Sequence, residues 1–223
     1  MLTHPPPYEG LNVFLTILNF ILIVFLNLLF LTLFSIINPR IIMFIFPLTT
    51  CTVATLLLFF FFLFALVNNG IPIWFRCFKG IENTDAFKTS LIIEGISFVH
   101  NLFKNKKYNL IFLADRWFPS CAVMNYIDSI NATYCIRAKS NVSIEINDFE
   151  DSDLIGYISH IEPFLSKSKF FDDITITKNK FKTKLAVSKS DTHAEPLFIL
   201  TNGNTREAIK HYGYRFRFYR IYI

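Results

Sequence analysis

One carboxylate in the sequence stands where α/β proteins commonly bind ligands. Asp115 follows directly after the apolar run from Tyr108 to Ala114, which has the length and composition of a buried strand. The crevice beyond the carboxyl ends of such strands is where α/β sheets hold ligands and metal ions. An Asp at a strand end is more commonly a turn or cap residue, so Asp115 alone leaves both interpretations open.

Other catalytic patterns are missing from the sequence. The 4 cysteines form no Cys-x-x-Cys pair and the 5 histidines show no ligand spacing, which argues against a zinc site. The 7 glycines form no phosphate-binding loop. No serine or cysteine lies in a nucleophile-elbow motif.

The elements around Asp115 are predicted from periodicity. Residues 91–103 have helical spacing, 108–114 form a buried strand, a helix opens at Pro119 and Ser120, and 133–138 form a second strand. This order predicts an α/β unit with a parallel strand pair. Further strands are predicted over 142–146 and 195–201, an edge ribbon with alternating lysines over 178–184, and a helix from Thr205.

The first third of the chain has a different composition. Only Arg40 among 22 basic residues, and only Glu9 among 17 acidic residues, lies before residue 68. Two uncharged apolar runs, 11–38 and 41–67, flank Pro39 and Arg40, and each is long enough as a helix to cross a bilayer. We therefore predict a two-helix transmembrane hairpin in the lipid bilayer. Arg76, Lys79 and Lys88 after the second run place both termini in the cytoplasm.

Two stretches in the remaining chain carry a family resemblance. The first is Asp115-Arg116-Trp117-Phe118, followed by a helix and by a strand ending in Arg137-Ala138-Lys139. The second is a strand ending in Leu200-Thr201-Asn202, followed by Tyr212-Gly-Tyr-Arg215. Their order resembles insertion-sequence transposases of the DDE class, which have Asp-Arg-x-Phe, then Leu-Thr-Asn, then a helix with Tyr-x-x-Arg-x-x-x-Glu.

The resemblance implies a ribonuclease H-like core for DNA transposition, that is, DNA binding and strand transfer. In such a core three carboxylates hold two divalent ions, Mg²⁺ or Mn²⁺, which activate the attacking oxygen and stabilise the leaving one. Asp115 corresponds to the second catalytic, metal-binding carboxylate. The residues expected to contact DNA are Arg116, Arg137, Lys139, Tyr212, Arg215 and Arg217.

The sequence departs from this family at the other two carboxylates. Tyr219 stands where the motif requires Glu. The first Asp belongs on a first core strand that lies three strands and a helix before Asp115. Asp85 is only 30 residues upstream, too near for those elements, and the membrane hairpin occupies the preceding region. We expect an incomplete ribonuclease H-like domain and an inactive, truncated remnant.

These expectations divide the chain into an N-terminal tail (1–10), the transmembrane hairpin (11–67), a linker (68–90) and the partial catalytic domain (91–223). The alternative is a small membrane-anchored protein whose cytoplasmic domain binds a partner and has no role on DNA. That alternative leaves the joint occurrence of the two transposase-like stretches to chance. Within the basic, aromatic tail after residue 206, nucleic-acid binding and packing against a core remain equally open.

Overall fold

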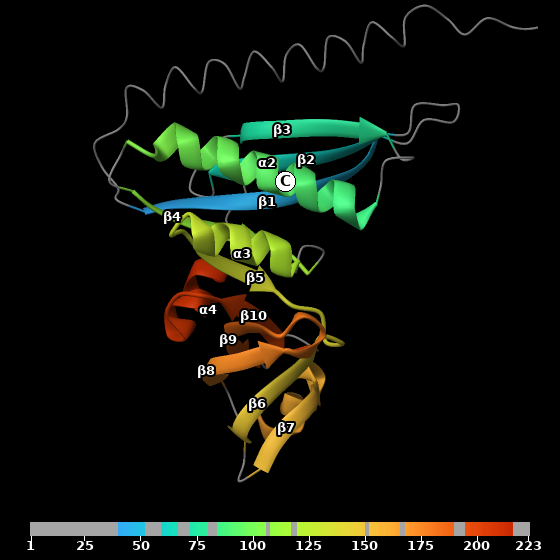
Figure 1. Cartoon of the computed structure of the whole chain (residues 1–223), viewed down its shortest axis with the longest axis vertical. Helices are drawn as coiled ribbons and strands as arrows, with labels where there is room; N and C mark the ends of the chain where they lie inside the picture. Colours follow the sequence, from blue (N-terminus) through green and yellow to red (C-terminus); the bar gives the residue numbers. More distant parts are fainter. Residues whose placement is uncertain are drawn as a thin grey trace, which may run out of the picture.

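A computed structural model describes residues 40–51, 59–66, 72–79, 84–105, 108–116, 120–149, 152–165, 168–189 and 195–215. These residues form a mixed α/β fold around one sheet (Figure 1). Its ten described strands have the order β3-β2-β1-β4-β5-β10-β9-β8-β6-β7.

The first five strands make up the half of the sheet that carries Asp115. β1 (Arg40–Cys51), β2 (Phe59–Leu66) and β3 (Pro72–Lys79) are antiparallel neighbours, and β1 runs parallel to β4 (Asn109–Ala114). β4 in turn pairs in parallel with β5 (Thr133–Arg137). The parallel pair predicted from the sequence is therefore confirmed.

The second half of the sheet is antiparallel. β10 (Leu197–Thr201) joins it to β5, and β9 (Phe181–Ser188), β8 (Ser168–Ile176), β6 (Ser143–Phe149) and β7 (Ser152–Tyr157) follow outward. Two 3₁₀ turns, η2 (Ile158–Phe164) and η3 (Thr177–Asn179), connect them. β4, β5 and β10, which match the strands predicted over 108–114, 133–138 and 195–201, thus belong to one sheet.

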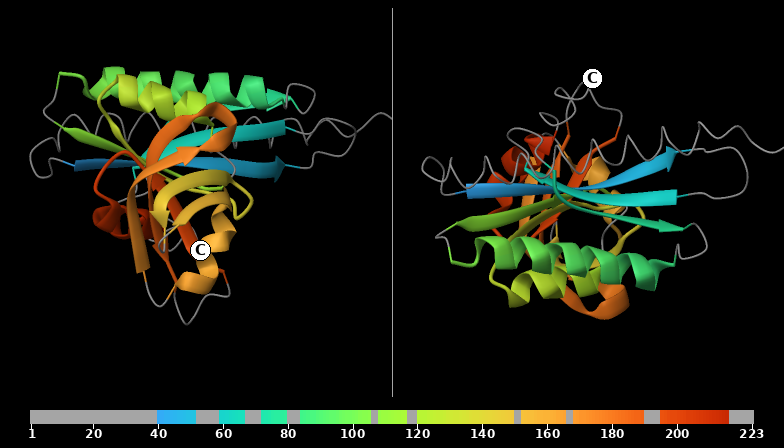
Figure 2. Two further views of the ribbon diagram at one scale, coloured as in Figure 1. Left: turned by 60° about the horizontal axis from the view of Figure 1, so that its bottom comes forward. Right: turned by 90° about the horizontal axis from the view of Figure 1, so that it is seen from above.

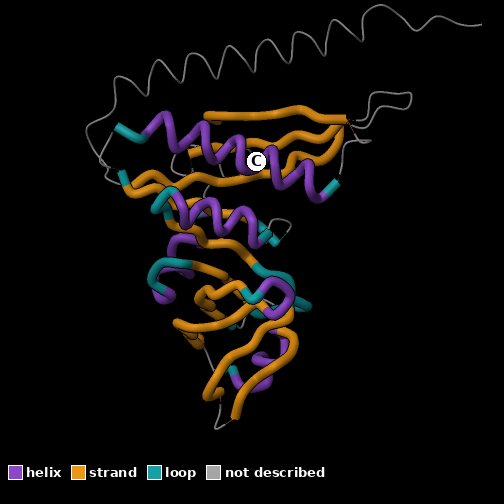
Figure 3. Tube along the Cα trace, viewed as in Figure 1, coloured by secondary structure: helices purple, strands orange, loops and turns teal. Residues whose placement is uncertain are grey.

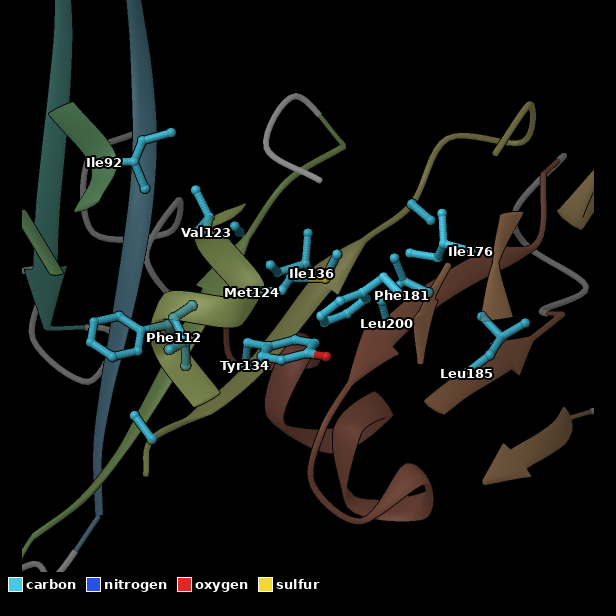
Figure 4. Packing of buried hydrophobic residues seen from close by; sticks show 14 of the residues in the cluster. Ile92, Phe112, Val123, Met124, Tyr134, Ile136, Ile176, Phe181, Leu185 and Leu200 are labelled. Carbon is cyan, nitrogen blue, oxygen red and sulfur yellow. The ribbon is translucent and has the colours of Figure 1, made fainter. Parts of the chain in front are cut away.

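The helices cover opposite faces of this sheet. α2 (Asp85–Phe103) and α3 (Cys121–Ser129) lie on one face, and α4 (Thr205–Gly213) lies on the other (Figure 2). The larger core fills the α2 and α3 face and runs through both halves of the sheet, from Phe112 and Tyr134 to Phe181 and Leu185 (Figure 4). A smaller cluster under α4 contains Leu113, Cys135, Ile199 and Tyr212 among others.

The structure corrects the predicted second membrane helix. Residues 41–67 contain β1 and β2, which pair with each other and, through β1, with β4 (Figure 3). β3 and the start of α2 occupy the predicted linker over 68–90. An uncharged apolar run is compatible with a strand as well as with a membrane span, so hydropathy alone does not separate the two. The first predicted span, 11–38, lies outside the described residues.

Two further differences concern the boundaries of the domain. The described part of the sheet starts at residue 40 rather than near 91, so three described strands and a helix do precede Asp115. That is the order implied by the ribonuclease H-like resemblance, and the sequence argument that these strands had no room was wrong. β9, predicted as an edge ribbon, lies between β10 and β8. Among the described helices, none has both the length and the apolar character needed to cross a membrane.

Candidate functional site

Asp115 lies at the carboxyl end of β4, where its side chain binds the C-terminal end of α4. Its Oδ2 is 2.7 Å from Nη1 of Arg215, in an ion pair whose two side chains are 22% and 7% exposed. Its Oδ1 accepts a hydrogen bond from the backbone N–H of Arg116 at 2.7 Å and one from the Tyr212 hydroxyl at 3.4 Å. The Arg215 guanidinium also stacks over the Tyr212 ring, 5.0 Å from its centroid.

These contacts decide the charge of Asp115. Burial by itself raises the pKa of the carboxyl group, because it disfavours the charged form. The Arg215 charge, the Arg116 backbone N–H and the more distant Arg137 outweigh burial and hold the pKa below its ordinary value of 3.8. Asp115 is therefore a carboxylate at neutral pH, and Arg215 provides its nearest positive charge.

A second carboxylate lies beside the same arginines. Glu195, just before β10, has its Oε2 3.7 Å from Nη1 of Arg116 and 3.8 Å from Nη2 of Arg137. We call Arg116, Arg137 and Arg215, with Asp115 and Glu195, the arginine cluster. Three arginines face two carboxylates there, so this group carries one net positive charge. Sequence reasoning placed Glu195 inside a strand and missed it as a member of the cluster.

The structure brings the two transposase-like stretches together. Tyr212 and Arg215 were expected to contact DNA, yet both side chains are buried against Asp115. Arg116 is 46% exposed, Arg137 is 20% exposed, and Lys139 lies at the surface. Arg217, and Tyr219 at the expected Glu position, lie outside the described residues.

The described residues around Asp115 do not fit the pair of Mg²⁺ or Mn²⁺ ions that the resemblance implies. Such ions prefer several carboxylate oxygens, but both oxygens of Asp115 already have protein donors. β1 is the strand expected to carry the first Asp, and Ile45 on it pairs with Ala114. All twelve residues of β1 lack a carboxylate. In the part of the chain that the structure describes, no three His, Cys, Asp or Glu side chains gather to hold a metal.

Side chains of the Leu-Thr-Asn stretch form hydrogen bonds that connect the end of β10 to β5 and to the turn before it. The Asn202 side-chain amide donates to Asp128 Oδ1 at 2.6 Å and to the Ala132 carbonyl at 2.8 Å. Its oxygen accepts the Tyr134 N–H at 3.0 Å. The Thr201 hydroxyl donates to the Tyr134 carbonyl at 2.6 Å. These contacts give Thr201 and Asn202 a structural role that a motif comparison alone does not reveal.

Replacing Asn202 with alanine should therefore lower the free energy of unfolding by roughly 1–3 kcal/mol, because backbone groups of Tyr134 and Ala132 lose their partner. Chemical denaturation measures this change. Asn202→Asp keeps the acceptor for Tyr134 N–H but places a second negative charge beside Asp128, so it should not rescue stability. Wild-type stability in either variant would show that this contact network is not formed.

Comparison with known proteins places the chain in no sequence family. No protein-family model and no curated protein sequence matches it. Among solved structures, it is similar to endonuclease V of Ciona intestinalis in complex with a 24mer DNA containing an inosine, at 16% identity and a TM-score of 0.40. That match covers 76% of this chain and 74% of the other. Human endonuclease V gives 10% identity and a TM-score of 0.38, covering 76% and 73%. At this level of similarity these structures assign no function to the chain.

Proposed function

We propose that this chain is a transposase-derived, nucleic-acid-binding protein that does not cut DNA. The observation that carries the proposal is the Asp115–Arg215 ion pair at the carboxyl end of β4. In the resembling family a divalent cation is expected beside this carboxylate. Here the Arg215 guanidinium neutralises the carboxylate instead. The stacking of this guanidinium on the Tyr212 ring holds it in place.

The charge of the arginine cluster supports an anionic ligand. Its net positive charge disfavours a divalent cation and favours a phosphate group. Arg116 and Arg137 are more exposed than Arg215, and Glu195, which pairs with both, is 70% exposed. A phosphate can take the place of this solvated carboxylate at small cost, because exposed ion pairs contribute little stability.

Binding of the full chain to a duplex of mixed sequence tests the proposal. We expect affinity that falls steeply with salt, with a slope set by the number of phosphates neutralised. The double variant Arg116→Gln/Arg137→Gln should reduce that slope by about 2 and weaken binding by roughly tenfold or more at moderate salt. Fluorescence anisotropy between low and moderate salt measures both.

A matched control removes two positive charges elsewhere. Lys88 lies on α2 and Lys104 directly follows it. α2 covers the end of the sheet that is far from β8 and β9 (Figure 1). Lys88→Gln/Lys104→Gln should bind DNA almost as the wild type does. Absence of salt-dependent binding by the wild-type chain would contradict the proposed function and favour a protein with no role on DNA.

A further inference from the structure

The β8–β9 connection presents lysines at alternate positions. Lys178 lies in η3, Lys180 in the turn, and Lys182 and Lys184 on β9. We call residues 177–184 the lysine hairpin. The side chains of Lys178, Lys180 and Lys182 are exposed, whereas Phe181 and Thr183 between them are buried. The tip therefore presents positive charge and almost no apolar surface.

These charges are not neutralised across the sheet. Lys182 stands opposite Thr175 on β8, and Lys184 stands opposite Thr201 on β10. None of the four lysines has an ion-pair partner among the residues that the structure describes. The nearby Asp172 carboxylate accepts a hydrogen bond from the Thr205 hydroxyl, at the first residue of α4. Four lysines held on one ribbon, none in an ion pair with a described residue although Asp172 and Glu145 lie on the nearby strands β8 and β6, form a site suited to a polyanion.

The register puts Lys182 and Lys184 of the lysine hairpin on the same face of the sheet as the arginine cluster. Leu113, Cys135, Thr201 and Lys184 form one row across β4, β5, β10 and β9. Leu113 and Cys135 pack under α4, so this row faces α4, and so do residues two positions away, Asp115 and Lys182. Lys182 is then displaced from Asp115 by about 13 Å along the strands and about 14 Å across them.

α4 lies between the two groups. It begins at Thr205, close to the Thr201–Lys184 pair, and Tyr212 near its end reaches Asp115. Arg206 and Lys210 are exposed on it, and Arg206 lies over the Phe170 ring at 5.7 Å. Positive side chains thus lie in the arginine cluster, on α4 beside its single acid Glu207, and on the lysine hairpin.

We propose that the lysine hairpin is a second phosphate-contacting surface, which extends the binding track for a nucleic-acid backbone across the α4 face. The proposal rests on the proposed function and assigns part of the binding to lysines that the transposase-like stretches do not include. A nucleic acid fits better than a lipid surface, because membrane-surface segments pair their cations with exposed apolar side chains. The tip instead buries its one aromatic residue, Phe181.

The test compares DNA binding by the full wild-type chain with Lys178→Gln/Lys182→Gln and with the control Lys88→Gln/Lys104→Gln. The hairpin variant should bind the mixed-sequence duplex at least about tenfold more weakly at moderate salt, with a salt slope reduced by about 2. The control should change affinity by less than about twofold. Equal thermal unfolding of the three proteins shows that the fold is retained.

The outcomes separate this inference from the proposed function. If the wild type binds DNA and Arg116→Gln/Arg137→Gln weakens binding, but the hairpin variant behaves like the control, only the hairpin inference is overturned. If the wild type does not bind DNA, both are overturned. The last measurement is binding to vesicles that contain phosphatidylserine. If the wild type binds these vesicles through the lysine hairpin but does not bind DNA, the ligand of the hairpin is a membrane surface and not a nucleic acid.

Discussion

Replacing Asp115 with alanine should destabilise the chain by about 3 kcal/mol, because the variant leaves the buried Arg215 guanidinium without its carboxylate. This value is at the lower end of the range for broken buried pairs, since Asp115 is 22% exposed and water can partly replace it. Urea denaturation monitored by tryptophan fluorescence measures the change. Glu195→Ala is the matched control, since it removes an exposed carboxylate and should cost little.

The pH dependence of stability provides an independent check on the same ion pair. The folded-state pKa of Asp115 is depressed below 3.8, so its contribution is fully present above that value. It is lost as the pH falls through the folded-state pKa, when Asp115 becomes protonated and Arg215 loses its partner. The wild type should therefore lose more stability than Asp115→Asn below about pH 4. Parallel curves for the two proteins would show that Asp115 is not paired.

Replacing Gly95 with alanine should destabilise the chain by roughly 1–3 kcal/mol, although alanine is the better helix former. Gly95 lies in the middle of α2, and a Cβ there would come within 2.8 Å of Cδ2 of Phe64 and closer still to its Cε2. Phe64 belongs to β2 and is fully buried against Trp74 and Phe112. Its ring cannot move aside without disturbing that packing.

This variant tests the correction to the membrane prediction. If residues 59–66 formed a membrane helix instead of β2, Gly95 would have no such neighbour, and alanine would stabilise α2 by up to about 1 kcal/mol. Gly213→Ala at the end of α4 is the control, because nothing lies within 4 Å of the position of its Cβ. Thermal unfolding of the two variants beside the wild type gives the sign of each effect.

The parts of the fold whose apolar residues recur with a clear period, and which are bounded by turn residues, could be predicted from the sequence. The strands at 109–114 and 133–137 and the helix between them have distinct apolar patterns, and a turn with Asn202 and Gly203 separates β10 from α4. β1 and β2 could not be told from a membrane helix by hydropathy. Their residues, RIIMFIFPLTTC and FFFFLFAL, have no polar alternation, and no charged or glycine-rich turn stands between them.

The candidate site could be predicted in part. The transposase-like stretches named Asp115, Tyr212 and Arg215, and these side chains do meet. Their contact could not be derived from spacing, because Asp115 and Tyr212 are 97 positions apart. The DNA contact that the resemblance implies for Arg215 stays a prediction, and in the structure Arg215 is buried and pairs with Asp115. The packing of α4 against the end of β4 brings the Arg215 guanidinium to Asp115, and a motif comparison does not reveal this packing.

A plasmid-nicking assay tests most directly the claim that Arg215 has taken the place of a metal ion. Supercoiled plasmid is incubated with the full wild-type chain, or with the Asp115→Asn variant, in the presence of Mg²⁺ or Mn²⁺. Because two-metal cleavage requires several carboxylates around both ions, we predict that the wild type leaves the plasmid supercoiled while still binding it. Nicking that requires the metal and is lost in Asp115→Asn would contradict the account. It would show that Asp115 exchanges Arg215 for a metal ion and works with carboxylates outside the described residues.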